Sequence, residues 1–330
     1  MACKGGGRDR LEAWKGRNIM IVCCGEALID MLPRETAGGE KAFVPHAGGA
    51  VFNTAIALGR LGTPVEFFSG LSSDLFGTQL RAALSASEVG TRYAHISGQP
   101  TTLAFVHLVD GQATYSFYDE NTAGRMLGEA ALPELGDDVD ALLFGAISLI
   151  PEPCGGTYEA LMRREHRRRV TMLDPNIRPG FIPDKARHQH RIRRMMAMAD
   201  IVKLSDEDLK WFAEAGSTDD IAARWLTSGP KLVIVTAGGD GATAYTGRAK
   251  VSVKPERVKI VDTVGAGDTF NAGVLASLHE HELLSKGRLD RLSEEDLRAA
   301  LTLGARAAAV TVSRSGANPP WRHELIQPKP

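Results

Sequence analysis

The residues best suited to chemistry lie near the end of the chain, between Asp262 and Gly273. The run Gly265-Ala266-Gly267 carries almost no side chain, so the backbone N–H groups of these residues are open to an anion. We expect a helix to begin there and to direct the positive end of its dipole at the same point. The negative charge of Asp268 repels a bound phosphate, so a carboxylate at this place needs another purpose. A base that takes a proton from the attacking hydroxyl is such a purpose.

Two other interpretations compete for this turn. In the first, it is only a tight strand-to-helix connection in which Asp268 favours the helix dipole. In the second, it opens a dinucleotide-binding fingerprint, but Phe270 occupies the place of the third glycine and too little chain follows for such a domain. The sequence disfavours the fingerprint and leaves the structural turn open.

A second polar group lies near the start of the chain. Gly48 and Gly49 precede an expected helix whose first turn holds Asn53, an amide that can both donate to and accept from sugar hydroxyls. Asn53 capping its own helix is the alternative. Asp30 follows the end of the first expected strand, where a carboxylate can bind two neighbouring hydroxyls or simply open an Asx turn.

Two further segments leave expected strands. Asp174-Pro175-Asn176-Ile177-Arg178 follows an apolar run and places polar groups at the carboxyl end of a strand, where α/β proteins bind ligands. Thr236-Ala237-Gly238-Gly239-Asp240-Gly241 closes another strand with glycines that let the backbone approach a flat or phosphorylated ligand. A hairpin turn explains this second segment equally well.

These segments must be positioned by a scaffold in which strands and helices alternate. The expected strands are 19–24, 65–68, 142–144, 170–173, 201–204 and 232–236. The expected helices are 50–61, 76–87, 158–168, 186–198 and 206–214, followed by a long one that starts at the capping sequence of Ser293 and ends near Ser313. Such alternation predicts an α/β domain with a mostly parallel sheet covered on both faces.

Two stretches, 31–46 and 101–118, break the alternation. The second contains Asp110-Gly111 between alternating runs, which is a hairpin signal. The inserted β structure is either a lid over the sheet edge or an extra antiparallel edge with no moving role. Residues 1–18, with Gly5-Gly6-Gly7 and several charges, predict a disordered leader or tag-like extension before one domain that spans 19–330.

Composition excludes several classes of protein. The 330 residues carry a net charge of -1, which offers no general field for nucleic acid or an acidic membrane surface. The local basic run 163–169 is interpreted as a solvated helix end. The longest strongly apolar stretch, 141–150, is about half of a membrane span. Cys3, Cys23, Cys24 and Cys154 form no metal spacing and predict buried thiols of a cytoplasmic protein.

Common rival chemistries find no match. The chain contains no Gly-Lys dipeptide, so a classical P-loop is absent. It also contains no Gly-x-Ser-x-Gly sequence, which is typical of the nucleophile turn of esterases. His279 and His281 lie two residues apart on different faces of a helix, where they cannot share one metal ion.

Taken together, Gly48-Gly49-x-x-x-Asn53 and Asp262-Thr-x-Gly-Ala-Gly-Asp268 resemble the two signatures of the ribokinase-type (pfkB) carbohydrate kinases, over about residues 19–320. Segments 117–123 and 199–208 look most like those of fructokinases, bacterial ones in particular. The resemblance implies a three-layer α/β/α ribokinase-like domain with a mostly parallel central sheet and a small β-sheet lid. It also implies transfer of the ATP γ-phosphate to a sugar CH2OH.

The resemblance assigns a role to individual residues. Asp268 would be the base, and the N–H groups of Gly265, Ala266 and Gly267 the anion hole. The residues that would contact the sugar are Asp30, Gly49, Asn53, Asn176 and Arg178. Those that would line the nucleotide are Lys203, Thr236, Gly238 and Gly241. Asp262 would help to hold a monovalent cation such as K+.

One position departs from the family pattern. The usual Asn-x-x-Glu that helps to organise Mg2+ and the phosphates reads Ser205-x-x-Asp208 here. The resemblance therefore assigns Asp208 to Mg2+ through a bridging water, with a side chain one methylene shorter.

The sequence thus predicts an ATP- and Mg2+-dependent kinase that phosphorylates D-fructose to fructose 6-phosphate, acting on small molecules alone and forming a homodimer through its lid. A 2-keto-3-deoxygluconate kinase is the close alternative, because Arg178 can clamp a carboxylate bidentately. Ribokinase is a further alternative. An inactive family member that senses sugar or binds a regulatory partner is the alternative from a different class.

Overall fold

The structure is a computed structural model that describes residues 20–109 and 112–326. The expected leader, 1–18, and the expected Asp110-Gly111 turn lie outside the described residues.

The centre of the molecule is an eight-stranded sheet with the order β14-β13-β12-β11-β10-β9-β1-β4. Its strands are β1 (Met20–Cys24), β4 (Val65–Phe68), β9 (Val139–Gly145), β10 (Val170–Asp174), β11 (Ile201–Ser205), β12 (Leu232–Thr236), β13 (Ala242–Tyr245) and β14 (Lys250–Val253). The six strands from β4 to β12 run parallel, and β13 and β14 pair antiparallel at one edge. The mostly parallel sheet is confirmed.

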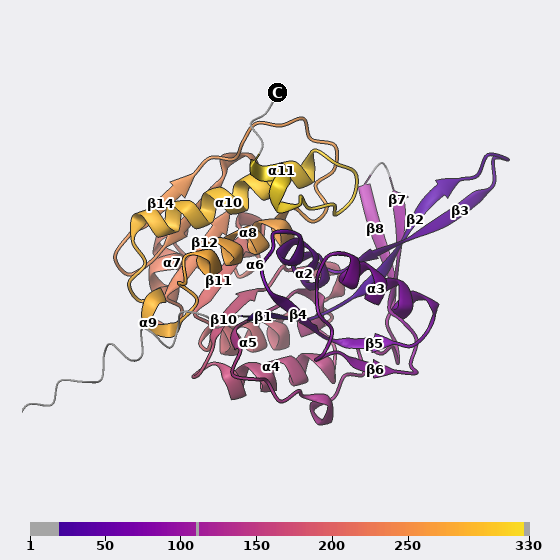
Figure 1. The fold of residues 1–330 in the computed structure, drawn as a ribbon, viewed down its shortest axis with the longest axis horizontal. Helices are drawn as coiled ribbons and strands as arrows, with labels where there is room; N and C mark the ends of the chain where they lie inside the picture. The colour runs from indigo at the N-terminus through magenta and orange to yellow at the C-terminus, as the bar shows by residue number, and fades with distance from the viewer. Residues whose placement is uncertain (1–19, 110–111, 327–330) are drawn as a thin grey trace, which may run out of the picture.

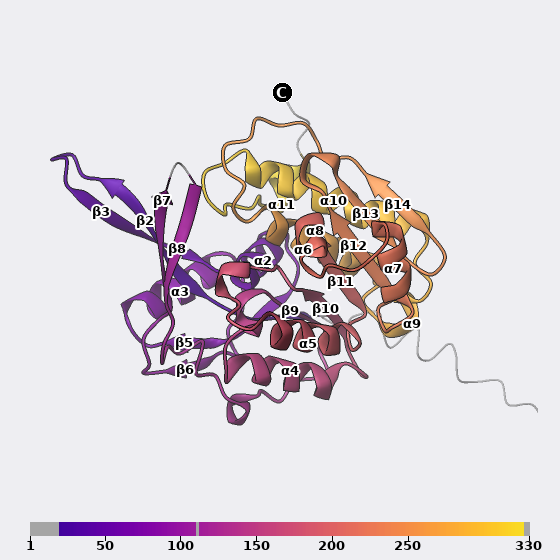
Figure 2. The ribbon, with the colours of Figure 1, turned by 180° about the vertical axis from the view of Figure 1, so that it is seen from behind.

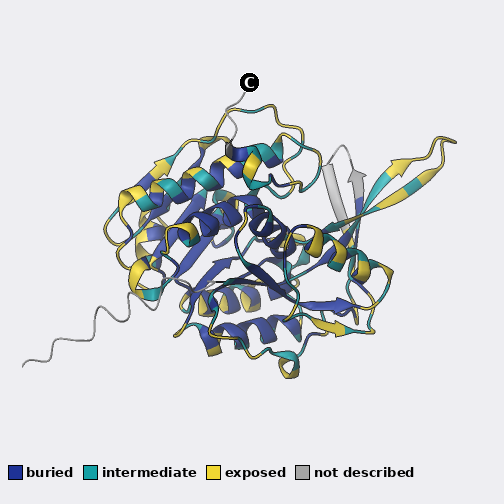
Figure 3. Cartoon of the chain, in the orientation of Figure 1, coloured by how far each residue is buried: buried dark blue, intermediate teal, exposed yellow. Residues whose placement is uncertain are grey.

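Helices cover both faces of this sheet (Figures 1 and 2). One face packs against α2 (Ala50–Arg60), α3 (Leu75–Ala86), α8 (Ala266–Glu280) and α10 (Glu294–Val312). The other packs against α4 (Cys154–Glu165), α5 (Lys185–Met196), α6 (Asp206–Trp211) and α7 (Thr218–Leu226). Because side chains alternate along a strand, Ile21 and Cys23 of β1 enter the first core, and Val22 and Cys24 enter the second. Figure 3 shows the buried sheet between helices whose outer faces are exposed.

A separate four-stranded sheet, which we call the small sheet, extends from the side of the molecule (Figure 1). It contains β2 (Leu28–Glu35), β3 (Lys41–Gly48), β7 (Leu103–Val109) and β8 (Gln112–Tyr118), in the order β3-β2-β7-β8. The inserted β structure is therefore not an added edge of the central sheet. Asp30 lies within β2 rather than in a loop after the first strand, which corrects its expected position.

Shorter elements complete the described fold. They are β5 (Gly70–Ser72), β6 (His95–Ser97), η1 (Glu129–Ala131), η2 (Ala146–Leu149), η3 (Pro179–Phe181), η4 (Gly238–Asp240), α9 (Lys286–Leu289) and α11 (Arg322–Ile326). The capping box at Ser293 is confirmed, since its side chain accepts from the N–H of Asp296 and the Asp296 carboxylate accepts in return. Cys23, Cys24 and Cys154 are buried free thiols, and Cys3 lies outside the described residues.

Helix α4 differs from its prediction at both ends, beginning at Cys154 and ending at Glu165. Gly155 makes the start of the helix hard to recognise in the sequence. It faces α5, and a Cβ there would lie 2.4 Å from Nη1 of Arg191 and 3.1 Å from the carbonyl oxygen of Leu149. Arg169 is also not solvated as expected. It is buried, its Nε donates to Glu165 at 2.8 Å, and its other nitrogens donate to backbone carbonyls.

No helix within 20–109 or 112–326 has both the length and the apolar character needed to cross a membrane.

Candidate active site

A cavity of about 1140 Å³ opens at the carboxyl ends of the central strands, beside the small sheet. It exceeds the roughly 300–1,000 Å³ of most single-ligand sites. The expected site residues that line it are Asp30, Gly49, Asn53, Asn176, Arg178, Lys203, Asp208, Thr236, Gly238, Gly241, Gly265, Ala266, Gly267 and Asp268. Segments far apart in the sequence are thus brought to one place, with Asp262 just beyond the lining residue Thr263.

The glycine turn forms the start of α8. Gly265 precedes the helix with φ 76°, a left-handed conformation that favours glycine, and a Cβ there would lie 2.7 Å from the Cβ of Ala317. The N–H of Ala266 makes one long bond, 3.3 Å, to the carbonyl of Thr263. Since the first N–H groups of a helix have no partner within it, this turn presents donors to the cavity.

Asp268 is 7% exposed and sits in the first turn of α8. Its Oδ2 accepts a hydrogen bond of 2.9 Å from Nδ2 of Asn53, so that asparagine contacts the expected base instead of capping its own helix. Burial raises the pKa of Asp268 to about 6, Asn53 and the nearby Lys203 and Arg178 lower it, and Asp174 raises it further. At neutral pH this carboxyl is largely ionised yet basic enough to take a proton.

A buried ion pair lies behind the turn. Lys203 and Asp174 are each 4% exposed, and Nζ of Lys203 donates to Oδ2 of Asp174 at 3.0 Å. Nδ2 of Asn271 donates to the same oxygen at 2.6 Å. A Cβ on Gly267 would lie 3.2 Å from Nζ of Lys203, so the ammonium group adjoins the glycine turn.

The paired glycines at the start of α2 each make room for a carboxyl-bearing residue. A Cβ on Gly48 would lie 2.3 Å from Oδ2 of Asp30, and one on Gly49 would lie 2.8 Å from the carbonyl oxygen of Glu26. Gly49 also has φ 111°. Burial raises the pKa of Asp30 to about 6 and is the largest influence raising that of Glu26 to about 7.

Two polar residues of the site were missed from the sequence. Asn271 follows Asp268 by three residues and therefore shares its helix face, a spacing that could have drawn attention to it. Glu26 lies two residues after the end of β1, and the carboxyl end of a central strand is a position typical of ligand-binding residues.

The segment after β10 faces the small sheet. The N–H of Asn176 donates to Oδ1 of Asp174 at 3.1 Å, and Asn176 has φ 40°. Arg178 uses one guanidinium nitrogen on the carbonyl of Ile177 and lines the cavity. The rings of Phe117 in β8 and Phe181 in η3 meet with centroids 4.1 Å apart, so the small sheet contacts the rim of the cavity.

Asp208 holds its own surroundings together. It forms a capping box with Ser205, and its Oδ1 accepts from the N–H of Ile177 at 2.9 Å. Burial, and then the charge of Asp174, raise its pKa. Within the part of the chain that the structure describes, no three His, Cys, Asp or Glu side chains converge on a metal position. A Mg2+ ion bound mainly by phosphates and water, with a single carboxylate nearby, fits that arrangement.

The remaining expected residues form the other end of the cavity. Thr236 ends β12, and η4 connects it to the antiparallel β13, so this segment is at once a hairpin connection and a cavity wall. Gly241 has φ 100°, and a Cβ there would lie 2.1 Å from the carbonyl oxygen of Val253. Asp262 accepts from the N–H groups of Val264 and Gly316, which fixes the turn before α8.

Comparison with known proteins gives a consistent result. A curated fructokinase from Rhizobium leguminosarum bv. trifolii is 61% identical over 279 residues, covering 84% of this chain and 86% of the relative. A probable fructokinase-4 from Arabidopsis thaliana is 33% identical, covering 94% and 95%. The crystal structure of a fructokinase with bound ATP from Xylella fastidiosa aligns with a TM-score of 0.85 and 29% identity, covering 94% of this chain and 98% of that one.

These similarities extend over the whole arrangement described above. The model of the pfkB family carbohydrate kinases matches residues 18–324, which include every expected site residue. The α/β/α layers with a separate small sheet agree with the ribokinase-like fold of the structural neighbours. The chain therefore belongs to the pfkB family of carbohydrate kinases.

Proposed function

We propose that this protein is an ATP-dependent fructokinase that converts D-fructose to fructose 6-phosphate, with Asp268 as the general base. The observation that carries the proposal is the position of Asp268, which sits in the first turn of α8 beside the glycine turn and accepts a hydrogen bond from Asn53 of the facing helix. The 61% identity to the Rhizobium fructokinase supports fructose as the acceptor.

In the proposed reaction, Asp268 takes the proton of the sugar's C6 hydroxyl while that oxygen forms a bond to the γ-phosphorus of ATP. The bond from the γ-phosphorus to the β–γ bridging oxygen breaks, and ADP leaves. The N–H groups of Gly265, Ala266 and Gly267 stabilise the negative charge on the transferring phosphoryl group. Asp30, Gly49, Asn53, Asn176 and Arg178 orient the sugar, and Lys203, Thr236, Gly238 and Gly241 border the nucleotide.

Two cations belong to the proposal. Mg2+ would neutralise charge on the ATP phosphates, and Asp208 would contact it through a water, because both carboxylate oxygens of Asp208 already accept backbone N–H groups. A monovalent cation such as K+ would lie near Asp262, whose carboxylate ties the turn before α8 to the loop at Gly316.

The small sheet would act as a lid and as the contact of a homodimer. Phe43, Phe105 and Tyr118 form an aromatic row on it, with ring centroids 5.0 and 5.4 Å apart. Phe43 is 40% exposed and Tyr118 63% exposed, and exposed aromatic groups of this kind favour association. Closure would exclude water from the phosphoryl group. The use of ATP and the buried free thiols suit a cytoplasmic enzyme.

A sugar panel tests the proposal. ADP release is measured with Mg-ATP and fructose, ribose or 2-keto-3-deoxygluconate, with and without K+. We expect the highest kcat/KM with fructose. A higher kcat/KM with 2-keto-3-deoxygluconate than with fructose would identify the protein as a 2-keto-3-deoxygluconate kinase instead. Sugar binding without ADP release would indicate an inactive protein that senses sugar.

The base is tested by Asp268→Asn. We expect fructose and ATP binding to persist and kcat to fall roughly 10²- to 10⁴-fold. Near-normal turnover would remove Asp268 from the role of base.

A further inference from the structure

Glu26 joins three segments at the sugar side of the cavity. It follows β1, and its Oε1 accepts hydrogen bonds from the N–H groups of Ala50, at 2.8 Å, and Val51, at 3.4 Å, which begin α2. Its Oε2 accepts from the N–H of Ser148 in η2 at 3.3 Å. Glu26 also lines the cavity itself. One carboxylate thus connects the end of a central strand, the start of α2 and the η2 segment.

The start of α2 depends on this contact. Gly49 approaches the backbone of Glu26 so closely that a Cβ there would lie 2.8 Å from the Glu26 carbonyl oxygen and 3.2 Å from its Cγ. The N–H of Asn53 bonds to the carbonyl of Gly49 at 2.8 Å, and Nδ2 of Asn53 bonds to Asp268. The placement of Asn53 against the base therefore follows from where Glu26 holds the first turn of α2.

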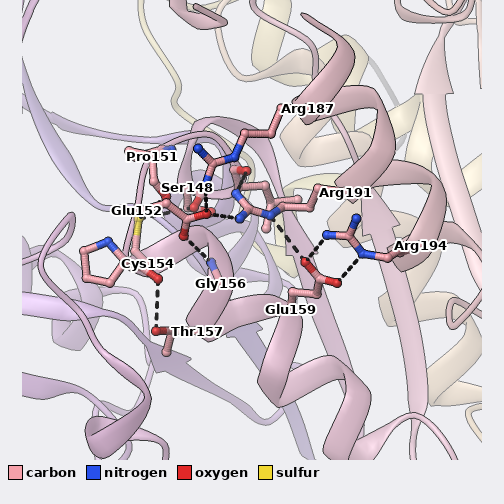
Figure 4. Close-up of polar contacts among 12 residues, drawn as sticks. Ser148, Pro151, Glu152, Cys154, Gly156, Thr157, Glu159, Arg187, Arg191 and Arg194 are labelled. Carbon is pink, nitrogen blue, oxygen red and sulfur yellow. Dashed lines mark hydrogen bonds and ion pairs between the residues drawn. The ribbon is translucent and has the colours of Figure 1, made fainter. Parts of the chain in front are cut away.

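The η2 side of the connection is firmly held. Oγ of Ser148 donates to the carbonyl of Gly145 at 2.7 Å, and Arg191 of α5 donates to the carbonyl of Leu149 at 2.9 Å. Figure 4 shows that Arg191 also pairs with Glu152 and Glu159, which links this segment to both α4 and α5. Glu26 consequently ties α2 to a wall that is fixed by its own ion pairs.

The charge of Glu26 is balanced between opposing influences. Burial raises its pKa most, the N–H groups of Glu26 itself, Ala50 and Val51 lower it, and the charge of Asp268 raises it, giving a value of about 7. The groups that face it are Asp268 from α8 and Tyr158 from α4, whose hydroxyl donates to the carbonyl of Gly25. As the pH falls through 7 the carboxyl gains a proton and becomes a poorer acceptor, so its hold on the N–H groups weakens.

We propose that Glu26 is a positioning residue for the sugar subsite, holding the start of α2 against η2 so that Gly49 and Asn53 meet the substrate. This inference rests on the proposed kinase function. It predicts that the ionised carboxylate of Glu26 supports sugar affinity and leaves ATP affinity unaffected, because its contacts lie on α2 and η2 rather than on the segments bordering the nucleotide.

The test is Glu26→Gln in the full-length protein, with steady-state kinetics at pH 8. An amide keeps one acceptor oxygen for α2 but turns an N–H2 group toward the N–H of Ser148. We expect KM for fructose to rise about tenfold or more, since a hydrogen bond to a charged group is lost, with KM for ATP within about twofold of wild type. Glu66→Gln is the matched control. Glu66 is a buried carboxylate in β4 that accepts a hydrogen bond from the N–H of Arg92 at 2.9 Å and does not line the cavity. In Glu66→Gln, KM for fructose and KM for ATP should both stay unchanged.

A pH series separates positioning from mere stability. Wild-type KM for fructose should rise as the pH falls from 8 to 6, and this rise should be reduced in Glu26→Gln. An unchanged KM for fructose in Glu26→Gln overturns the inference. A wild-type KM for fructose that does not change between pH 8 and pH 6 also overturns it, and this measurement does not depend on the folding of a variant. If the wild-type protein releases no ADP with fructose, the proposed fructokinase function is wrong. This outcome differs from an active wild-type enzyme whose KM for fructose is unaffected by Glu26→Gln, which would contradict only the role of Glu26.

Discussion

Replacing the buried carboxylate of Asp268 with an amide should stabilise the folded protein at pH 8 while it removes turnover. The carboxylate is 7% exposed, and its main compensation is one hydrogen bond from Asn53. An amide in Asp268→Asn keeps an acceptor oxygen for that bond and carries no charge to desolvate. The same residue that performs the proposed chemistry thus destabilises the fold.

The magnitude follows from the pKa. Asp268 has a pKa of about 6 in the folded protein against 3.8 ordinarily, so the folded state binds its proton more tightly than the unfolded state does. Ionisation at high pH therefore costs stability, and that cost disappears as the pH falls below both values. The difference corresponds to about 3 kcal/mol at pH 8. At pH 5 the folded carboxyl is already mostly protonated, which leaves about half of that cost.

Urea unfolding of wild type and Asp268→Asn at pH 8 and pH 5 measures both numbers. Asp200→Asn is the matched control. Asp200 is equally buried, but its carboxylate accepts from the N–H of Thr171 at 2.8 Å and from Nζ of Lys286 at 2.6 Å. Its substitution breaks an ion pair and should lower the free energy of unfolding, by about 1–3 kcal/mol.

An Asp268→Asn variant that is less stable than wild type at pH 8 would contradict this reasoning. So would a gain that is the same at both pH values, because the effect would then not come from ionisation. A stabilised variant without turnover would also exclude misfolding as the cause of lost activity.

Two further predictions concern other parts of the site. Lys203→Met leaves Asp174 buried without its ammonium partner and should lower the free energy of unfolding, measured in urea titrations, by about 3–5 kcal/mol. Lys210→Met breaks a solvent-exposed Lys–Asp pair at 2.8 Å and should leave the free energy of unfolding almost unchanged. Phe117→Ala removes the ring contact to Phe181 and should raise KM for the sugar several-fold with little loss of stability. Steady-state kinetics and thermal unfolding measure the two effects. An unchanged KM for the sugar would mean that this contact is not used when the small sheet closes.

The scaffold was predictable wherever a local pattern decided the outcome. Strands β4 and β12 were predicted residue for residue, because short β-branched and aromatic runs are bounded by polar or glycine turns. The start of α10 was marked by its capping box. The start of α4 was missed, since two glycines stand in its first turn and the contact of Gly155 with Arg191 comes from a helix that follows later in the chain.

The site residues likewise include some that a local sequence pattern predicts and some that only the assembled fold brings together. Asp268 and the glycine turn are contiguous, so the chemistry proposed for them could be inferred from the sequence. Glu26 is different, because its partners at Ala50 and Ser148 come together only when β1, α2 and η2 are assembled. Arg169 was predicted to be solvated on the evidence of neighbouring charges, and only the fold shows that Glu165 and backbone carbonyls surround it.

The charges around Asp268 explain how a buried acid can serve as a base near neutral pH. Burial and Asp174 favour its protonated form, and Asn53, Lys203 and Arg178 favour the anion. With a pKa of about 6, roughly ten carboxyls are ionised for each protonated one at pH 7. A lower pKa would make the carboxylate a weaker proton acceptor, and a higher one would leave fewer molecules ionised. Lys203 would therefore act twice in the proposed reaction, since its ammonium group offsets the charge of Asp174 and adjoins the glycine turn at Gly267 that would bind the phosphoryl group.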